Sequence, residues 1–106
     1  MIGVQVTATH CVSDGHYPDW LRLRLIDAHG REWLILEKVP VVTLEDLDEN
    51  SVYPRTIVLA CQEVSRRASA GRELVLIDLN IPWGIQTTDG TTCIEVFTDQ
   101  LAPSPI

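Results

Sequence analysis

Residues 9–20, with the sequence THCVSDGHYPDW, hold side chains whose types and spacing could do chemistry. They include His10, Cys11 and His16, together with two aspartates. Histidine and cysteine are the usual ligands of protein-bound zinc, and a cysteine beside a histidine is the usual pair in thiol catalysis. Whether either chemistry is possible depends on the secondary structure that positions these residues.

A zinc site needs four converging ligands, or three with water in the fourth position. His10 and Cys11 are neighbours on a predicted strand, so their side chains point to opposite faces. The remaining histidine, His29, follows a second predicted strand, which separates it from His16 by about 26 Å at ~3.3 Å per residue. We therefore predict no metal site.

A catalytic Cys11 would need a neighbouring cation or a helix N-terminus to lower the pKa of its thiol. No lysine or arginine occurs in residues 1–21, and His16 is the nearest candidate base. The acids of residues 45–49 are more typical of a solvated helix start than of a hydrolytic pair. We predict no catalytic residue and no cofactor. The alternative is a small-molecule-binding or hydrolytic β-barrel with His10, Cys11 and His16 at its rim.

The composition favours one soluble domain. The chain has 106 residues, of which 45% are apolar, and this suffices for a hydrophobic core. We predict that residues 1–100 form a single domain and residues 101–106 a loose tail. The net charge is −7 and residues 73–106 contain no lysine or arginine, so the sequence excludes the basic surface that nucleic acids require.

The sequence favours a cytoplasmic protein of bacterial type. The longest apolar runs are far shorter than the ~20 residues of a transmembrane helix, and the N-terminus lacks the features of a signal peptide. We therefore expect no membrane association. Three cysteines without paired spacing indicate reduced thiols, of which Cys11 should react fastest while Cys61 stays inert.

Alternating apolar and polar residues predict strands through most of the chain. The clearest is residues 2–12, followed by a turn rich in Ser, Asp, Gly and Pro. Residues 20–39 are typical of a hairpin around His29 and Gly30, and a two-residue loop sets Leu25 opposite Leu34. The same register places Asp27 opposite Glu32, an unfavourable pair of like charges, so a longer loop remains possible.

The second half of the sequence predicts one short helix and further strands. Thr43 as an N-cap, with acids after it, favours a helical turn near residues 44–49. Residues 55–64 resemble a strand, with a helix over residues 60–70 as the alternative. Asp89–Gly90 predicts a hairpin with Ile81, Trp83, Ile85, Ile94 and Val96 on its core face, and a kink near residues 81–84. The expected fold is all-β, with about six antiparallel strands in a meander that forms a small barrel or sandwich.

One surface of the first hairpin is the best candidate for function. The predicted register places apolar, aromatic and arginine side chains opposite the leucine face, and the candidate interface residues are Trp20, Arg22, Arg24, Trp33 and Ile35. Tryptophan and arginine are enriched at binding hot spots. A second sheet that covers this face is an equally good explanation. We expect a non-catalytic module that binds a protein partner or a second copy as a homodimer. The negative charge also suits an acidic inhibitor or immunity-type protein.

Overall fold

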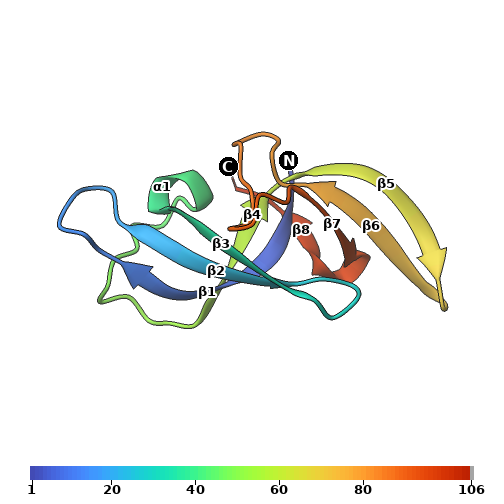
Figure 1. Cartoon of the computed structure of the whole chain (residues 1–106), viewed down its shortest axis with the longest axis horizontal. Helices are drawn as coiled ribbons and strands as arrows, with labels where there is room; N and C mark the ends of the chain where they lie inside the picture. Colours follow the sequence, from blue (N-terminus) through green and yellow to red (C-terminus); the bar gives the residue numbers. More distant parts are fainter. Residues whose placement is uncertain (106) are drawn as a thin grey trace.

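The computed structural model describes residues 1–105 and shows an antiparallel all-β fold with two sheets (Figure 1). The first sheet has the order β3-β2-β1-β4, with β8 also pairing with β1. Its strands are β1 (Ile2–Val12), β2 (Trp20–Ile26), β3 (Glu32–Lys38), β4 (Arg55–Ala60) and β8 (Leu101–Pro103). The second sheet has the order β5-β6-β7, formed by β5 (Gln62–Ser69), β6 (Arg72–Asp78) and β7 (Cys93–Phe97). The prediction of an antiparallel all-β fold is confirmed, as a sandwich-like arrangement with eight strands where about six were expected, and not as a closed barrel. The strand order departs from a simple meander because β4 and β8 return to pair with β1.

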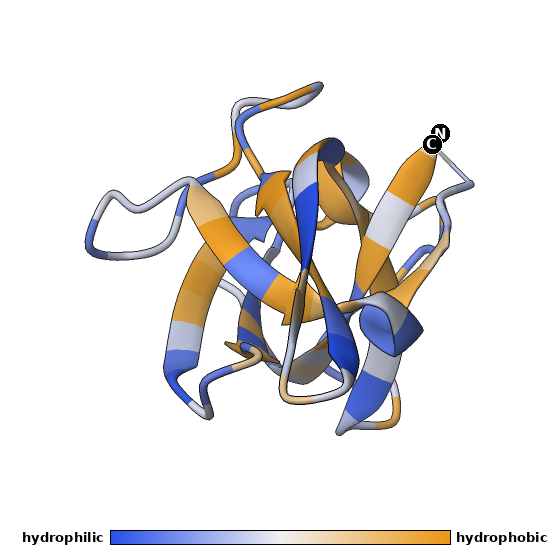
Figure 2. Ribbon diagram, turned by 90° about the vertical axis from the view of Figure 1, so that its right-hand side faces the viewer, coloured by the Kyte–Doolittle hydropathy of each residue, from blue (hydrophilic) through white to orange (hydrophobic). Residues whose placement is uncertain are grey.

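β1 is the centre of the first sheet, with the bounds that the sequence predicts. Val4, Val6 and Ala8 are buried, whereas the residues between them face outward, and this alternation of hydropathy along the strands is visible in Figure 2. The register with β2 shifts between Ala8 and His10, so the strand contains a bulge there. The bulge keeps Cys11 opposite the buried Leu21 and His10 opposite the exposed Arg22.

The first hairpin forms, but its predicted register is wrong by one residue. Leu25 pairs with Trp33 and Leu23 with Ile35, so the loop has five residues, 27–31. The cause is the buried carboxylate of Asp27, which accepts hydrogen bonds from the backbone N–H groups of His29 (2.8 Å) and Arg31 (2.9 Å). An aspartate that satisfies the loop backbone in this way stabilises the longer turn.

The two-residue turn occurs in the second hairpin. Ser69 pairs with Arg72, and both turn residues have positive φ, 51° at Ala70 and 76° at Gly71. These dihedral angles are those of a type I′ turn, although alanine rarely occupies its first position. Residues 62–69 are therefore strand, and the alternative of a helix over residues 60–70 is wrong.

The predicted helical turn near residues 44–49 is also misplaced. The helix α1 (Val39–Val42) directly follows β3, with Pro40 in its first turn, where the missing N–H of proline costs no hydrogen bond. Thr43 ends this helix and accepts a hydrogen bond from the N–H of Glu45. Residues 44–49 are irregular, with the side chain of Leu47 buried in the core.

The predicted Asp89–Gly90 hairpin does not form between strands. The partner of β7 is β6, with Ile77 opposite Ile94, and residues 79–92 form a long connection. The kink near residues 81–84 is confirmed. Ile85, Ile94 and Val96 are in the core as predicted, but Ile81 and Trp83 are exposed.

The end of the described chain lies against its beginning. Residues 101–103, expected to belong to a loose tail, form β8, and the Ser104 N–H donates to the Met1 carbonyl. The two termini lie near one another in Figures 1 and 2. One cluster of buried side chains spans both sheets. Within residues 1–105, no helix is long and apolar enough to cross a membrane.

Candidate protein-interaction surface

The outer surface of β2 and β3 combines arginines with exposed apolar side chains. We call it the hairpin face, and its residues are Trp20, Arg22, Arg24 and Ile26 of β2 with Leu34 and Leu36 of β3. Leu34 is 51% exposed, Ile26 is 48% exposed and Leu36 is 44% exposed. Side chains of this kind are more often buried, so three of them on one sheet surface make it a candidate binding surface.

The corrected register changes the membership of this face. Trp33 and Ile35, predicted beside the arginines, lie on the opposite, inner surface of β3, where Ile35 is only 1% exposed. Trp33 is half-buried against the core, and its indole N–H donates to Asp27 at 2.9 Å. Trp20, Arg22 and Arg24 remain on the outer surface, while Leu34 and Leu36 take the places predicted for Trp33 and Ile35.

The hairpin is held in position by its loop. The Ala28 N–H donates to the Glu95 carbonyl of β7 at 2.9 Å, and the side chain of His29 contacts the Glu95 carboxylate at 2.8 Å. Arg67 of β5 contacts the same carboxylate at 2.7 Å. Hydrogen bonds from Arg67 and then His29 lower the pKa of Glu95 from 4.5 to about 2. These contacts tie the hairpin to the second sheet, which makes the hairpin face a fixed surface.

The arginines of the hairpin face differ from all other arginines of the chain. Arg31, Arg55, Arg66, Arg67 and Arg72 each pair with a carboxylate. Arg22 and Arg24 are exposed and have no ion-pair partner among residues 1–105. In a chain of net charge −7, two cations without an ion pair therefore lie on one strand, with the carboxylate of Glu32 opposite Ile26 on the same face.

A shallow depression of about 520 Å³ lies over the hairpin face. Its lining includes Arg22, Arg24, Leu34 and Leu36, together with Glu32 of β3 and His10 of β1. At one end the outer edge of β3 is covered, because the Thr88 N–H donates to the Leu34 carbonyl at 2.8 Å. The depression therefore offers apolar area beside two cations and one carboxylate.

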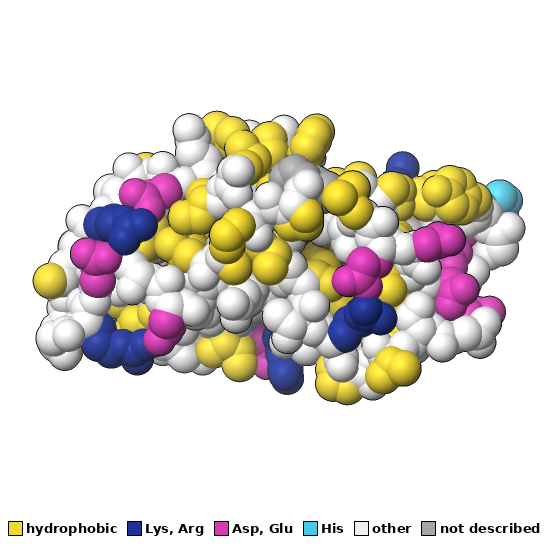
Figure 3. Space-filling view, turned by 180° about the vertical axis from the view of Figure 1, so that it is seen from behind, with side chains coloured by type: hydrophobic (Ala, Val, Ile, Leu, Met, Phe, Trp, Pro, Cys, Tyr) yellow, Lys and Arg dark blue, Asp and Glu magenta, His cyan; other side chains and the backbone are white. Residues whose placement is uncertain are grey.

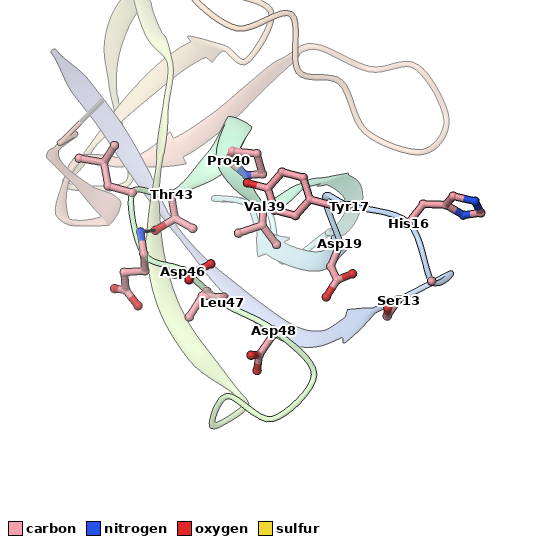
Figure 4. Close-up of a pocket in the computed structure, with 13 residues that line it drawn as sticks. Ser13, His16, Tyr17, Asp19, Val39, Pro40, Thr43, Asp46, Leu47 and Asp48 are labelled. Carbon is pink, nitrogen blue, oxygen red and sulfur yellow. Dashed lines mark hydrogen bonds between the residues drawn. The ribbon is translucent and has the colours of Figure 1, made fainter.

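The three residues of the alternative rim site are not brought together. His10 lies on the outer surface of β1, Cys11 is half-buried on its inner surface, and the side chain of His16 is 87% exposed in the loop that follows. A cleft of about 500 Å³ lies next to His16, but neither His10 nor Cys11 lines it. Figure 4 shows the imidazole of His16 pointing away from this cleft.

Cys11 and Cys61 are not activated as nucleophiles. Burial, followed by the nearby Asp19 carboxylate, raises the pKa of Cys11, and burial raises the pKa of Cys61 to about 11. The structure shows Cys93, and not Cys11, as the exposed thiol, which contradicts the expected order of reactivity. Within residues 1–105, no group of His, Cys, Asp and Glu side chains is arranged to hold a metal ion.

The sequence pattern did not identify a second exposed surface, because it assigned Trp83 to the core. Trp83 is 52% exposed and, with Pro40, Val41 and Leu44, lines a groove beside α1. The kink predicted at residues 81–84 was the one sequence signal that could have indicated it, since a broken strand does not keep the alternation of buried and exposed residues.

No known protein family, curated protein or solved structure matches this chain.

Proposed function

We propose that this chain is a non-catalytic protein-interaction module that binds a protein partner through the hairpin face. The observation that carries the proposal is the pair of uncompensated arginines, Arg22 and Arg24, beside the exposed Leu34 and Leu36. Arginine next to apolar side chains is typical of the centre of protein interfaces. The three cysteines, which lack paired spacing, support a reducing and therefore cytoplasmic location.

The hairpin face favours a partner with an apolar centre and carboxylates around it. Leucine side chains contribute buried apolar area, and Arg22 and Arg24 favour acidic groups at the rim. A second copy is one such partner, because the chain is itself acidic. A role as an acidic inhibitor or immunity-type protein belongs to the same proposal, with the hairpin face as the site of contact.

The test compares Arg24→Glu and Leu36→Ser with wild type. Both side chains are exposed, so both variants should keep the wild-type melting temperature. Each variant should weaken binding to the partner at least tenfold. If the wild type self-associates, each variant should instead sediment as a monomer. Arg66→Glu, which reverses an exposed arginine of the second hairpin, is the matched control and should leave binding unchanged.

Two results would contradict the proposal. The first is that Arg24→Glu and Leu36→Ser bind the isolated partner as tightly as wild type does. The second is that Arg66→Glu weakens binding as much as they do, because the effect would then follow total charge and not the hairpin face.

The cleft beside His16 favours a second candidate function, the binding of a small molecule. Its lining contains Asp19, Asp46 and Asp48, which would prefer a cationic ligand. His16 points away from the cleft and the pKa of the nearby Cys11 is raised, so neither group is placed to act as a base or nucleophile there. The cleft therefore supports binding better than hydrolysis.

A further inference from the structure

An exposed tryptophan lines an apolar groove next to α1. The groove has a volume of about 450 Å³ and is lined by Pro40, Val41, Leu44 and Trp83. Leu44 is 72% exposed and Trp83 is 52% exposed. Tryptophan is the residue most enriched at binding hot spots, and Figure 3 shows apolar side chains gathered along this upper side of the molecule.

The groove is held by buried residues on both sides. Val39 and Val42 anchor α1 in the core, so Pro40 and Val41 lie between two buried positions. The connection that carries Trp83 is anchored by Leu79 and Ile85, both 0% exposed, and the Ile85 N–H donates to the Leu79 carbonyl at 3.2 Å. Trp83 is therefore presented on a short loop whose two ends are fixed.

An acidic cleft continues from the apolar groove. Pro40 and Leu44 line both cavities. Figure 4 shows Asp19, Asp46 and Asp48 around the cleft, whose lining contains no lysine or arginine. Within residues 1–105 these three carboxylates form no ion pair, whereas Glu45 at the edge pairs with Arg55. Magenta side chains at the right-hand end of Figure 3 show the same acidic end of the molecule.

We propose that the groove and cleft together bind a basic segment of another protein. An apolar side chain of this segment contacts Trp83 and Leu44, and a lysine or arginine beside it reaches Asp46 and Asp48. The charges are complementary, and the net charge of −7 attracts a basic partner from a distance. This site is separate from the hairpin face and does not depend on the proposed function.

The test uses two amidated eight-residue peptides as probes, one of alternating leucine and arginine, and one with glutamate in place of each arginine. Binding is followed by NMR at the indole N–H of Trp83, which is assigned by its loss in Trp83→Phe. The basic peptide should shift this signal saturably, with a dissociation constant below about 1 mM, and more weakly at high salt. The glutamate peptide should not shift it.

Matched variants locate the contact. Asp46→Asn combined with Asp48→Asn removes two charges but keeps the side-chain oxygen that accepts the Asn50 N–H, so the loop stays intact. This double variant should weaken binding of the basic peptide at least about tenfold. Glu49→Gln with Asp14→Asn removes two charges outside the lining of the cleft and should leave the affinity within about twofold. Arg24→Glu, on the hairpin face, should not weaken binding, and this separates the result from the test of the proposed function.

Several results would overturn the inference. The first is that the Trp83 signal does not move at concentrations of the basic peptide up to 5 mM. The second is that the glutamate peptide binds as tightly as the basic peptide. The third is that the control variant loses as much affinity as the Asp46 and Asp48 double variant. A shift of the Trp83 signal with protein concentration alone, together with a dimer in sedimentation, would assign the groove to a second copy and would also contradict it.

Discussion

The two hairpins of this protein use arginine in opposite ways. In the β5–β6 hairpin, Arg66 contacts Glu63 at 2.6 Å and Glu73 at 2.8 Å, and all residues of β5 are exposed. In the β2–β3 hairpin, Arg22 and Arg24 have no acidic partner among the described residues and lie beside exposed leucines. The charge of Arg66 is paired within its own hairpin, whereas the β2–β3 hairpin leaves two unpaired charges and exposed apolar area on its surface.

The loops of the two hairpins differ, although both hairpins are attached to the rest of the molecule, since β6 pairs with β7 and Arg67 of β5 contacts Glu95. The β2–β3 loop places Asp27 in the interior and hydrogen-bonds to β7, while the β5–β6 turn projects from the molecule in Figure 1. A rigid sheet surface loses less conformational entropy on binding than a mobile one. Under the proposed function, recognition belongs to the first hairpin, whereas the second is a solvated edge whose arginines are paired with acids.

The largest expected effect comes from Asp27→Ala. The change leaves the N–H groups of His29, Arg31 and Trp33 without their acceptor in a buried loop. We expect a loss of about 3 kcal/mol in the free energy of unfolding, measured with urea. Asp14→Ala, which removes an acceptor of one N–H in an exposed loop, should cost less than about 1 kcal/mol. Equal losses in the two variants would show that Asp27 does not hold the hairpin.

A smaller, pH-dependent effect is expected at Glu95, which connects the two hairpins. Its pKa is lowered from 4.5 to about 2, first by Arg67, so its ion pair with Arg67 stabilises the fold fully above pH 4.5 and is lost as the pH falls toward 2. Glu95→Gln should therefore be less stable than wild type at pH 7, and the difference should disappear on acidification toward pH 2. A difference that stays constant from pH 7 to pH 2 would exclude this linkage.

The smallest effect is expected in the second hairpin. Arg66 is exposed and its ion pairs are in contact with water, where the gain from a pair is nearly cancelled by its costs. Arg66→Gln should not resolvably change the urea midpoint at moderate salt. A clear destabilisation would show that the β5–β6 ion pairs hold the structure, and the contrast between the hairpins would then be weaker.

The sequence predicted strands better than it predicted pairings. The alternation in β1 identified its bounds because its two faces meet different surroundings. The register of the first hairpin depends on the Asp27 carboxylate turning inward, a contact that no alternation of hydropathy encodes. Two members of the predicted interface, Trp33 and Ile35, changed faces for this reason, since a slip of one residue exchanges the two sides of a strand.

The exposed groove could not be predicted from pattern alone. Trp83 follows the alternation of a core strand, but Pro82 and Gly84 interrupt pairing and residues 79–92 leave the sheet. Its exposure is decided by where this connection places Trp83 beside α1, which is a property of the tertiary fold.

The most direct test of the central claim is photo-crosslinking at one position in each hairpin. A diazirine-bearing residue replaces Leu36 on the hairpin face or Val64 on β5, two side chains of similar exposure, 44% and 52%. In cells that contain the protein naturally, position 36 should give one discrete crosslinked protein, which is lost when Arg24→Glu is added, and position 64 should give none. Equal crosslinking at both positions, or a product at position 36 that survives Arg24→Glu, would contradict the account.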